Sequence, residues 1–411
     1  MSLSTQNYKG TRDFYPDEMR LRKWMFSKWR EVMESFGYEE YDGPILESLD
    51  LFTAKTSEEI VNDQSFNFTD RGGRRVIMRP EMTPTVSRMV AKKRQELGYP
   101  LRLYSIPNCF RYERQQRGRL REFWQLNADI FGVEGVQAEF EMMLLINKLM
   151  ESFGATEDMY EIRINSRMFL DKRIAEAGVK TSLPEITRLI DAFEKLEADI
   201  FTQKLKDQVE DAEKLYSFLT NDGGTAEGDE LINKAKKAGV KNIRFVPTIA
   251  RGFEYYTDIV FEVFDKNPDN NRSMFGGGRY DGLVGEFGVD PVPTVGFGMG
   301  DVTFQNFLET NDLIDDLKTE TDLYLIPIGE VESETQAIAQ DLRTKGLNVA
   351  VDLSGKKLDK QIKTAEKKGI NNVVFVGEEE VKSSKYKLKN LNTGKEVVAS
   401  LDEISKIIST T

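Results

Sequence analysis

The sequence predicts an α/β protein, in which an α+β body with a mainly antiparallel sheet flanked by helices precedes a smaller α/β unit. Extended segments within residues 105–132 alternate apolar and polar side chains, as in an antiparallel sheet with one covered face, and the sheet resumes at residue 243. Between them, residues 168–240 are helical in pattern and rich in charge. From residue 322, strands alternate with helices, which is typical of a parallel sheet with right-handed crossovers. We therefore expect a body made of residues 1–167 and 241–315, a helical insertion domain at 168–240, and a separate domain at 320–411.

The body begins with a helix predicted at Asp17–Phe36. Its apolar residues recur at helical spacing, and Gly37 is placed to end it. Pro44 lies inside the extended run that follows, which puts this run at a sheet edge or a bulge. The next elements are expected to be a hairpin of Ser65–Asp70 and Arg75–Arg79, a helix from Thr83 to about Leu97 with Thr83 as N-cap and Pro84 at its first position, a helix at Val136–Phe153 and a strand at Tyr160–Ile164.

The C-terminal unit follows a polar, acidic linker at Asn311–Thr321. Six lysines cluster around one of its helices, which fits either a soluble helix surface or a surface for RNA. Its expected elements are strands at Leu323–Pro327, Asn348–Asp352 and Asn372–Val376, helices at Glu332–Lys345 and Leu358–Lys368, a hairpin that turns at Asn392-Thr393-Gly394, and a last helix at Leu401–Ile408.

Composition narrows the chemistry. Apolar content of 39% and charged content of 31% describe a soluble globular protein, and no apolar run is long enough to span a bilayer. The N-terminus has no apolar signal segment, and the single cysteine, Cys109, excludes an internal disulfide, so we expect a cytoplasmic protein. A net charge of −12 argues against broad, sequence-blind nucleic-acid binding but allows a local basic surface. The chain contains no histidine, so its chemistry must use carboxylates, arginines, tyrosines and bound metal.

The stretch Ser105–Gly132 reads as two extended segments joined by a short basic loop. Because side chains of a strand alternate between faces, Arg111 and Glu113 share one face of the first segment. On the second, Phe123, Gln125, Asn127 and Asp129 share a face, and Trp124, Leu126, Ala128 and Ile130 form an apolar opposite face. A half-exposed hairpin with solvated charges is the alternative interpretation. An arginine that holds a phosphate beside a glutamate that accepts from an amino group would instead suit a nucleotide.

Phe110-Arg111-Tyr112-Glu113 resembles motif 2 of the class II aminoacyl-tRNA synthetases, where F-R-x-E binds ATP. The helix and extended run that end at Glu47 resemble motif 1, which implies a homodimer. Residues 79–83 resemble the R-P-E-x-T segment of the histidyl-tRNA synthetase family. This resemblance implies that the segment Glu81-Met82-Thr83 binds the α-ammonium group of histidine. The alternative interpretation is that Glu81 and Thr83 only stabilise the start of a helix.

Two further segments resemble ones that are specific to that family. Residues 251–257 resemble R-G-L-D-Y-Y-T, and residues 277–281 match G-G-R-Y-D. Motif 3 departs from the pattern. It usually ends G-x-E-R or G-x-D-R, with the arginine on the ATP γ-phosphate, whereas this chain has Asp301-Val302-Thr303 with no arginine nearby. Another cation or a metal must therefore make that contact.

The resemblance covers essentially the whole chain and implies an enzyme that joins histidine and ATP into histidyl-adenylate, then transfers histidine to tRNA(His). It implies that Arg111 and Arg251 act at the reacting phosphate and carboxylate. In the ATP site, Glu113 would read the adenine amino group and Arg119 would approach the other phosphates. Magnesium would bridge phosphate oxygens through ligands that the sequence does not assign. The histidine pocket would consist of Glu81, Met82, Thr83, Arg111, Gln125, Asp129, Arg251, Tyr255, Tyr256 and Tyr280.

Neutral imidazole has one N–H donor and one bare acceptor. We expect Asp129 to accept from the first and a hydroxyl of Tyr255 or Tyr256 to donate to the second. The C-terminal unit resembles an anticodon-binding domain, and the family's insertion contacts the tRNA acceptor arm. Two alternatives are an inert regulatory subunit of ATP phosphoribosyltransferase and a module that only senses uncharged tRNA. The absent motif 3 arginine is the only feature that favours the second.

Overall fold

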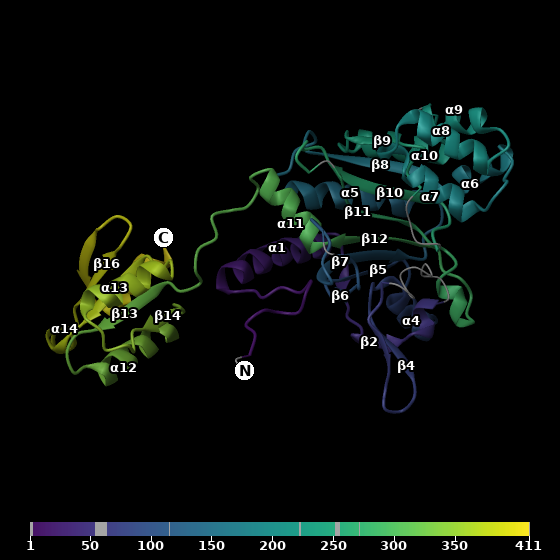
Figure 1. Cartoon of the computed structure of the whole chain (residues 1–411). Coiled ribbons are helices and arrows are strands. Elements are labelled where there is room, and N and C mark those ends of the chain that lie inside the picture. The colour runs from purple at the N-terminus through teal and green to yellow at the C-terminus, as the bar shows by residue number, and fades with distance from the viewer. Residues whose placement is uncertain are drawn as a thin grey trace. The chain divides into compact units, whose positions relative to one another are not determined.

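The computed structural model describes residues 3–53, 64–114, 116–221, 223–250, 255–270 and 272–410. The chain divides into two compact units, residues 1–314 and residues 315–411 (Figure 1). None of the helices in the described ranges is both long and apolar enough to cross a membrane.

The first unit is built on a large sheet with the strand order β1-β5-β7-β12-β11-β10-β8-β9, and β6 pairs with β7 beside this path. The pairs β1–β5 and β8–β9 are parallel and the others are antiparallel, so the predicted mainly antiparallel sheet is confirmed. The strands are β1 (Glu39–Glu40), β5 (Leu101–Ser105), β6 (Asn108–Phe110), β7 (Glu122–Phe131), β8 (Tyr160–Ser166), β9 (Ile243–Phe245), β10 (Ile259–Asp265), β11 (Arg272–Arg279) and β12 (Thr294–Gly300).

Helices cover one face of this sheet and form the main core with it (Figure 1). Trp29 of the first helix is fully buried there, and Leu126, Ala128 and Ile130 of β7 belong to the same core, as the alternating pattern predicted. The first helix ends as predicted, because Phe36 caps it and Gly37 adopts φ +77°. The covering helices are α1 (Pro16–Ser35), α5 (Gln137–Ser152), α10 (Ala226–Lys237) and α11 (Asp301–Thr310).

A three-stranded antiparallel sheet, in the order β2-β4-β3, lies before helix α4 in the chain. It consists of β2 (Leu46–Ser48), β3 (Asn67–Thr69) and β4 (Arg75–Met78), and it is accompanied by α2 (Asp50–Thr53) and α4 (Thr83–Lys93). Two details of the predicted helix were wrong. Met82 rather than Thr83 occupies the N-cap position, with no side-chain cap, and the helix ends four residues before Leu97 because residues 94–96 form a turn.

The charge-rich helical stretch forms a small core of its own. Leu170, Ile186, Phe201 and Leu215 are buried in this core, whereas Leu231 of α10 packs into the main core. The elements around the small core are α6 (Arg167–Glu176), α7 (Leu183–Asp191), η1 (Phe193–Lys195), α8 (Ala198–Gln208) and α9 (Ala212–Thr220).

The second unit has a five-stranded sheet in the order β14-β13-β15-β16-β17. The pairs β13–β14 and β13–β15 are parallel, and the closing hairpin is antiparallel, which confirms the predicted α/β unit. A short helix after β15 was not predicted. The elements are β13 (Leu323–Pro327), α12 (Glu332–Thr344), β14 (Val349–Val351), α13 (Leu358–Lys367), β15 (Asn372–Val376), α14 (Glu378–Ser383), β16 (Tyr386–Asn390), β17 (Glu396–Ala399) and α15 (Leu401–Ser409).

Candidate active site

The largest group of predicted site residues meets in one cavity of about 1310 Å³ in the first unit. Alternation along β7 explains which residues reach it, because Phe123, Gln125 and Asp129 line the cavity while their neighbours point into the helix-covered core. The predicted residues that line it are Glu81, Thr83, Arg111, Glu113, Arg119, Gln125, Asp129, Tyr255, Tyr256 and Tyr280.

Two predicted residues are not among those that line it. Met82 is fully buried beside the start of α4, so its side chain serves the core. Arg251 lies outside the described residues. The prediction that Arg251 shares the cavity with Arg111 therefore stays a prediction.

Arg111 is held in place by contacts on three sides. Its Nε donates to the carbonyl oxygen of Pro80 at 2.9 Å, and its guanidinium carbon lies 5.2 Å from the centre of the Phe123 ring. Glu113 is 4.0 Å from Nη1 of Arg111, and its other oxygen accepts from Arg119 at 3.3 Å. Both arginines therefore bring positive charge to the cavity, and Glu113 lies between them.

A second group of lining residues is aromatic and acidic. The rings of Tyr255, Tyr256 and Tyr280 form an edge-to-face cluster, with centres 5.0 to 6.4 Å apart. The Tyr280 hydroxyl donates to Oδ1 of Asp129, and the Tyr255 hydroxyl donates to Oε2 of Glu81 at 2.9 Å. Burial raises the pKa of Asp129 to about 7, and the hydrogen bond from Tyr280 opposes part of this rise.

Glycines on the two central strands leave space for the side chains of β7. Gly296 is paired with Asp129, and a β-carbon there would collide with the Asp129 carboxylate. A β-carbon at Gly298 would likewise collide with the amide of Gln125, and one at Gly278 would lie 3.0 Å from the Tyr256 ring. These glycines are therefore required for close packing over the sheet surface.

Asp301, at the start of α11, forms an ion pair with Arg12 of the N-terminal segment. It is buried and accepts from Nη2 of Arg12 at 2.6 Å and from the backbone N–H of Trp124 at 2.9 Å. Burial raises its pKa, and Arg12 opposes this rise. Asp301 therefore fixes the end of β12 against β7 instead of presenting a carboxylate to the cavity.

Comparison with known proteins assigns the family. A family model described as Histidyl-tRNA synthetase matches residues 10–300, and one described as Anticodon binding domain matches residues 322–411. A histidine–tRNA ligase of Leptospira biflexa is 41% identical over 423 residues, which cover 98% of this chain and 96% of that protein. This chain belongs to the histidyl-tRNA synthetase family.

Histidyl-tRNA synthetases from distant sources share the sequence and the fold. A histidine–tRNA ligase of Haloarcula marismortui is 34% identical over 410 residues, covering 95% of this chain and 94% of that protein. The crystal structure of histidyl-tRNA synthetase from Nostoc sp. PCC 7120 superposes with a TM-score of 0.82 at 23% identity, and the match covers 100% of both chains. The latter likeness supports the fold alone.

Two charged residues are notable among the cavity-lining residues that the sequence analysis did not name. Glu262 on β10 is a buried carboxylate flanked on both sides by apolar residues, and a charge inside that apolar run could have marked it. Arg272, the first residue of β11, also lines the cavity, and the sequence analysis gave it no role. The absence of the histidyl-tRNA synthetase motif 3 arginine could have prompted a search for a substitute such as Arg272.

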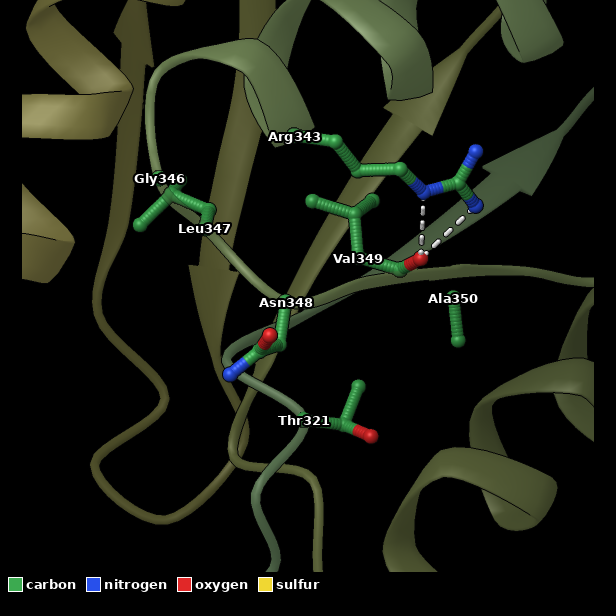
Figure 2. Close-up of a pocket in the computed structure, with 7 residues that line it drawn as sticks. All are labelled: Thr321, Arg343, Gly346, Leu347, Asn348, Val349 and Ala350. Carbon is green, nitrogen blue, oxygen red and sulfur yellow. Dashed lines mark hydrogen bonds between the residues drawn. The ribbon is translucent and has the colours of Figure 1, made fainter.

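The C-terminal unit contains a second cavity of about 520 Å³ (Figure 2). Its one charged lining residue among those described, Arg343, donates from Nε and Nη2 to the carbonyl oxygen of Val349, at 3.2 and 2.8 Å (Figure 2). This cavity therefore does not gather the acids and cations that the larger cavity does. It is lined by Thr321, Arg343, Gly346, Leu347, Asn348, Val349 and Ala350.

Proposed function

We propose that this chain activates histidine with ATP and then transfers the histidyl group to the 3′ end of tRNA(His). Membership of the histidyl-tRNA synthetase family supports the reaction. The site is proposed because Arg111 and Asp129 line one cavity, the first near Glu113 and Arg119 and the second bonded to Tyr280 of the tyrosine cluster. An inert regulatory role is not favoured, because curated histidine–tRNA ligases match this chain over nearly its full length.

The activation step needs positioning and charge neutralisation more than covalent help. A carboxylate oxygen of histidine forms a bond to the α-phosphorus of ATP. The bond from that phosphorus to the bridging oxygen breaks, and the electron pair leaves with pyrophosphate. Arg111 would neutralise charge on the α-phosphate and on the attacking carboxylate, with Arg251 as the second cation. Arg119 would approach the remaining phosphates, and Glu113 would accept from the adenine amino group.

Histidine would be selected by its imidazole ring. Asp129 would accept from the ring N–H, and a tyrosine hydroxyl would donate to the bare nitrogen. The donor to histidine would be Tyr256 or Tyr255, and Tyr255 would first have to release Glu81, to which its hydroxyl donates. Gln125 and Tyr280 would close the pocket, and Glu81 with Thr83 would bind the α-ammonium group.

Mg²⁺ fits this site only as an ion carried by the ATP phosphates. Mg²⁺ commonly binds one or two carboxylates together with phosphate oxygens and water. Glu262, a carboxylate that lines the cavity and is not assigned to the adenine, matches that donor set. In the described part of the chain, no group of three acidic or cysteine side chains could hold a metal alone. The ion would neutralise phosphate charge.

We also propose a cytoplasmic homodimer that binds tRNA through its C-terminal unit and its inserted helices. Ile45, Leu46 and Phe68 lie in or beside the three-stranded sheet near motif 1 and are 44 to 49% exposed, which supports an apolar interface there. Sedimentation equilibrium should give twice the chain mass of 47.0 kDa. The chain mass alone would contradict the dimer.

The decisive experiment for the reaction is histidine-dependent exchange of pyrophosphate into ATP. We expect exchange with histidine and with none of the other amino acids, followed by charging of tRNA(His). Arg111→Gln should lower kcat by about 10²- to 10³-fold, because it removes a preorganised donor at the reacting centre. An enzyme that is folded but shows no exchange would refute the proposed function.

A further inference from the structure

Thr303 occupies the position at which the motif 3 arginine is expected, and its hydroxyl group is engaged in hydrogen bonds within the protein. Its hydroxyl donates to the carbonyl oxygens of Met274, at 2.8 Å, and Gly300, at 3.1 Å. Thr303 lines the cavity but brings no charge to it. A cation for the terminal phosphate of ATP must therefore come from another element.

Arg272 reaches the same place from a neighbouring strand. A β-carbon at Gly118, in the basic loop, would lie 3.2 Å from Nη1 of Arg272 and also 3.2 Å from Cγ2 of Thr303. Arg272 and Thr303 thus approach one point of this loop, and both line the cavity. Nη1 of Arg272 donates to the carbonyl oxygen of Arg117 at 2.9 Å, so the guanidinium is held against the loop.

The charge of Arg272 is not neutralised within the described part of the chain. Arg119 pairs with Glu113, Arg12 pairs with Asp301 and Arg279 pairs with Glu139, but no described carboxylate lies within 4.0 Å of Arg272. Its one hydrogen bond to a described residue goes to a neutral carbonyl group. A partly buried guanidinium without a carboxylate partner is well suited to bind an anion.

Along β11, Arg272 lies far from the proposed histidine pocket, where the terminal phosphate of ATP is expected. Gly278, at the other end of β11, pairs with Gly296, which in turn pairs with Asp129 of the histidine pocket. Arg272 and Gly278 are about 20 Å apart along the strand at roughly 3.3 Å per residue. Arg111 lines the cavity as the proposed cation for the α-phosphate, and Arg119, the other proposed phosphate cation, is paired with Glu113, so Arg272 is the further cation available to the most distal phosphate.

We propose that Arg272 binds the γ-phosphate of ATP and replaces the motif 3 arginine that this chain lacks. This proposal rests on the proposed function. Arg272 contributes a charge-assisted hydrogen bond to the γ-phosphate and neutralises negative charge as pyrophosphate leaves. The exposed Arg117 also lines the cavity, but it lies in the loop and donates to the carbonyl oxygen of Asp269, so it has a smaller part.

The first test is Arg272→Gln, measured by histidine-dependent pyrophosphate exchange. We expect kcat/KM for ATP to fall about 10- to 100-fold, the range expected for a hydrogen bond to a charged group, with the KM for histidine unchanged. Arg94→Gln is the matched control, because Arg94 also donates to backbone carbonyls but lies away from the cavity. Arg117→Gln should have a smaller effect. Unchanged ATP kinetics in Arg272→Gln, or a larger loss in Arg117→Gln, would refute the assignment.

The second test identifies the phosphate. Binding of ATP and of ADP is measured for the parent and for Arg272→Gln. The parent should prefer ATP, and the variant should lose this preference while it binds ADP as the parent does. An equal loss for both nucleotides would overturn the γ-phosphate assignment. If Arg272→Gln does not fold, Arg272→Lys is used instead and should lose only part of the preference for ATP, because it keeps the charge but not the guanidinium fork.

The third test is rescue by Thr303→Arg, which places an arginine at the motif 3 position. In the Arg272→Gln background, Thr303→Arg should restore at least half of the lost kcat/KM for ATP. If Thr303→Arg restores no activity, this result would contradict the proposal that Arg272 replaces an arginine at position 303. The parent enzyme separates the two proposals: an inactive parent refutes the proposed function, whereas an active parent with a normal Arg272→Gln variant refutes only the role of Arg272.

Discussion

The Tyr280 hydroxyl donates a hydrogen bond to Oδ1 of Asp129, a carboxyl that is only 3% exposed. Burial raises the pKa of Asp129 to about 7, so this group titrates close to neutral pH. The imidazole of free histidine also titrates near 6.5. Ligand and pocket therefore change charge within the same pH range, which makes the site testable by pH.

Asp129→Ala should raise the KM for histidine at least about tenfold with little change in the KM for ATP, because it removes a hydrogen-bond acceptor from the imidazole. Pyrophosphate exchange at varied histidine and varied ATP measures both constants. Equal KM values for histidine in the variant and the parent would remove Asp129 from the pocket.

The pH profile provides a second prediction. Below about pH 7, Asp129 becomes protonated and loses its full capacity to accept from the imidazole N–H, so kcat/KM for histidine should fall as the pH falls through 7. In Asp129→Asn, the protein's part of this titration should vanish, and the remaining change should follow the imidazole near 6.5. Superimposable profiles for the parent and the variant would contradict this assignment.

The ionised form of Asp129 should also lower the stability of the folded protein at high pH. Its pKa is raised in the folded state, so the folded protein holds a proton that the unfolded chain loses above about pH 4. Stability from this group is present below about pH 4 and is lost as the pH rises to about 7, by up to a few kcal/mol. Asp129→Asn should therefore melt at a higher temperature than the parent at pH 8, with a smaller difference at pH 5. A difference that does not depend on pH would show that Asp129 does not titrate there.

The ion pair of Arg279 and Glu139 supports the tyrosines indirectly. Arg279 donates from Nε and Nη2 to the two oxygens of Glu139, at 2.7 and 2.8 Å, and both side chains are buried. Its backbone carbonyl accepts from the N–H of Thr257, next to Tyr256, and Tyr280 follows it in the chain. Glu139→Leu alone should destabilise the fold by up to about 3–5 kcal/mol, because it removes the buried partner of Arg279 and leaves only the more exposed Asp281, at 3.1 Å, as a carboxylate partner.

The double variant Glu139→Leu with Arg279→Met separates stability from positioning. Apolar replacement of a buried pair is often neutral for stability, so the double variant should melt within a few degrees of the parent. Its KM for histidine should nevertheless stay raised, because Tyr280 and the strand that precedes it lose their anchor to α5. A stable double variant with a normal KM would show that the pair has no effect on the pocket.

The sequence analysis correctly predicted the orientation of those candidate site residues that follow the two-residue repeat of a β-strand. Alternation along one strand was enough to bring Phe123, Gln125 and Asp129 to the cavity, because strand side chains can point only to two faces. The start of α4 was misjudged at Thr83, because capping depends on backbone angles that the residue type does not fix. Arg272 was missed because its role follows from proximity to Thr303 across the sheet, and no local pattern contains that relationship.

Gly296 provides the last prediction. Gly296→Ala would push a methyl group into the Asp129 carboxylate, and overpacking of this kind typically costs about 1–3 kcal/mol. If Asp129 moves to relieve the collision, its geometry toward imidazole is lost, so the KM for histidine should rise while the KM for ATP stays near that of the parent. Gly98→Ala is the matched control, because no described atom lies within 4 Å of a β-carbon at Gly98. A Gly296→Ala enzyme with parental KM for histidine would show that Asp129 can move without loss of the pocket, and would weaken its proposed role as the imidazole acceptor.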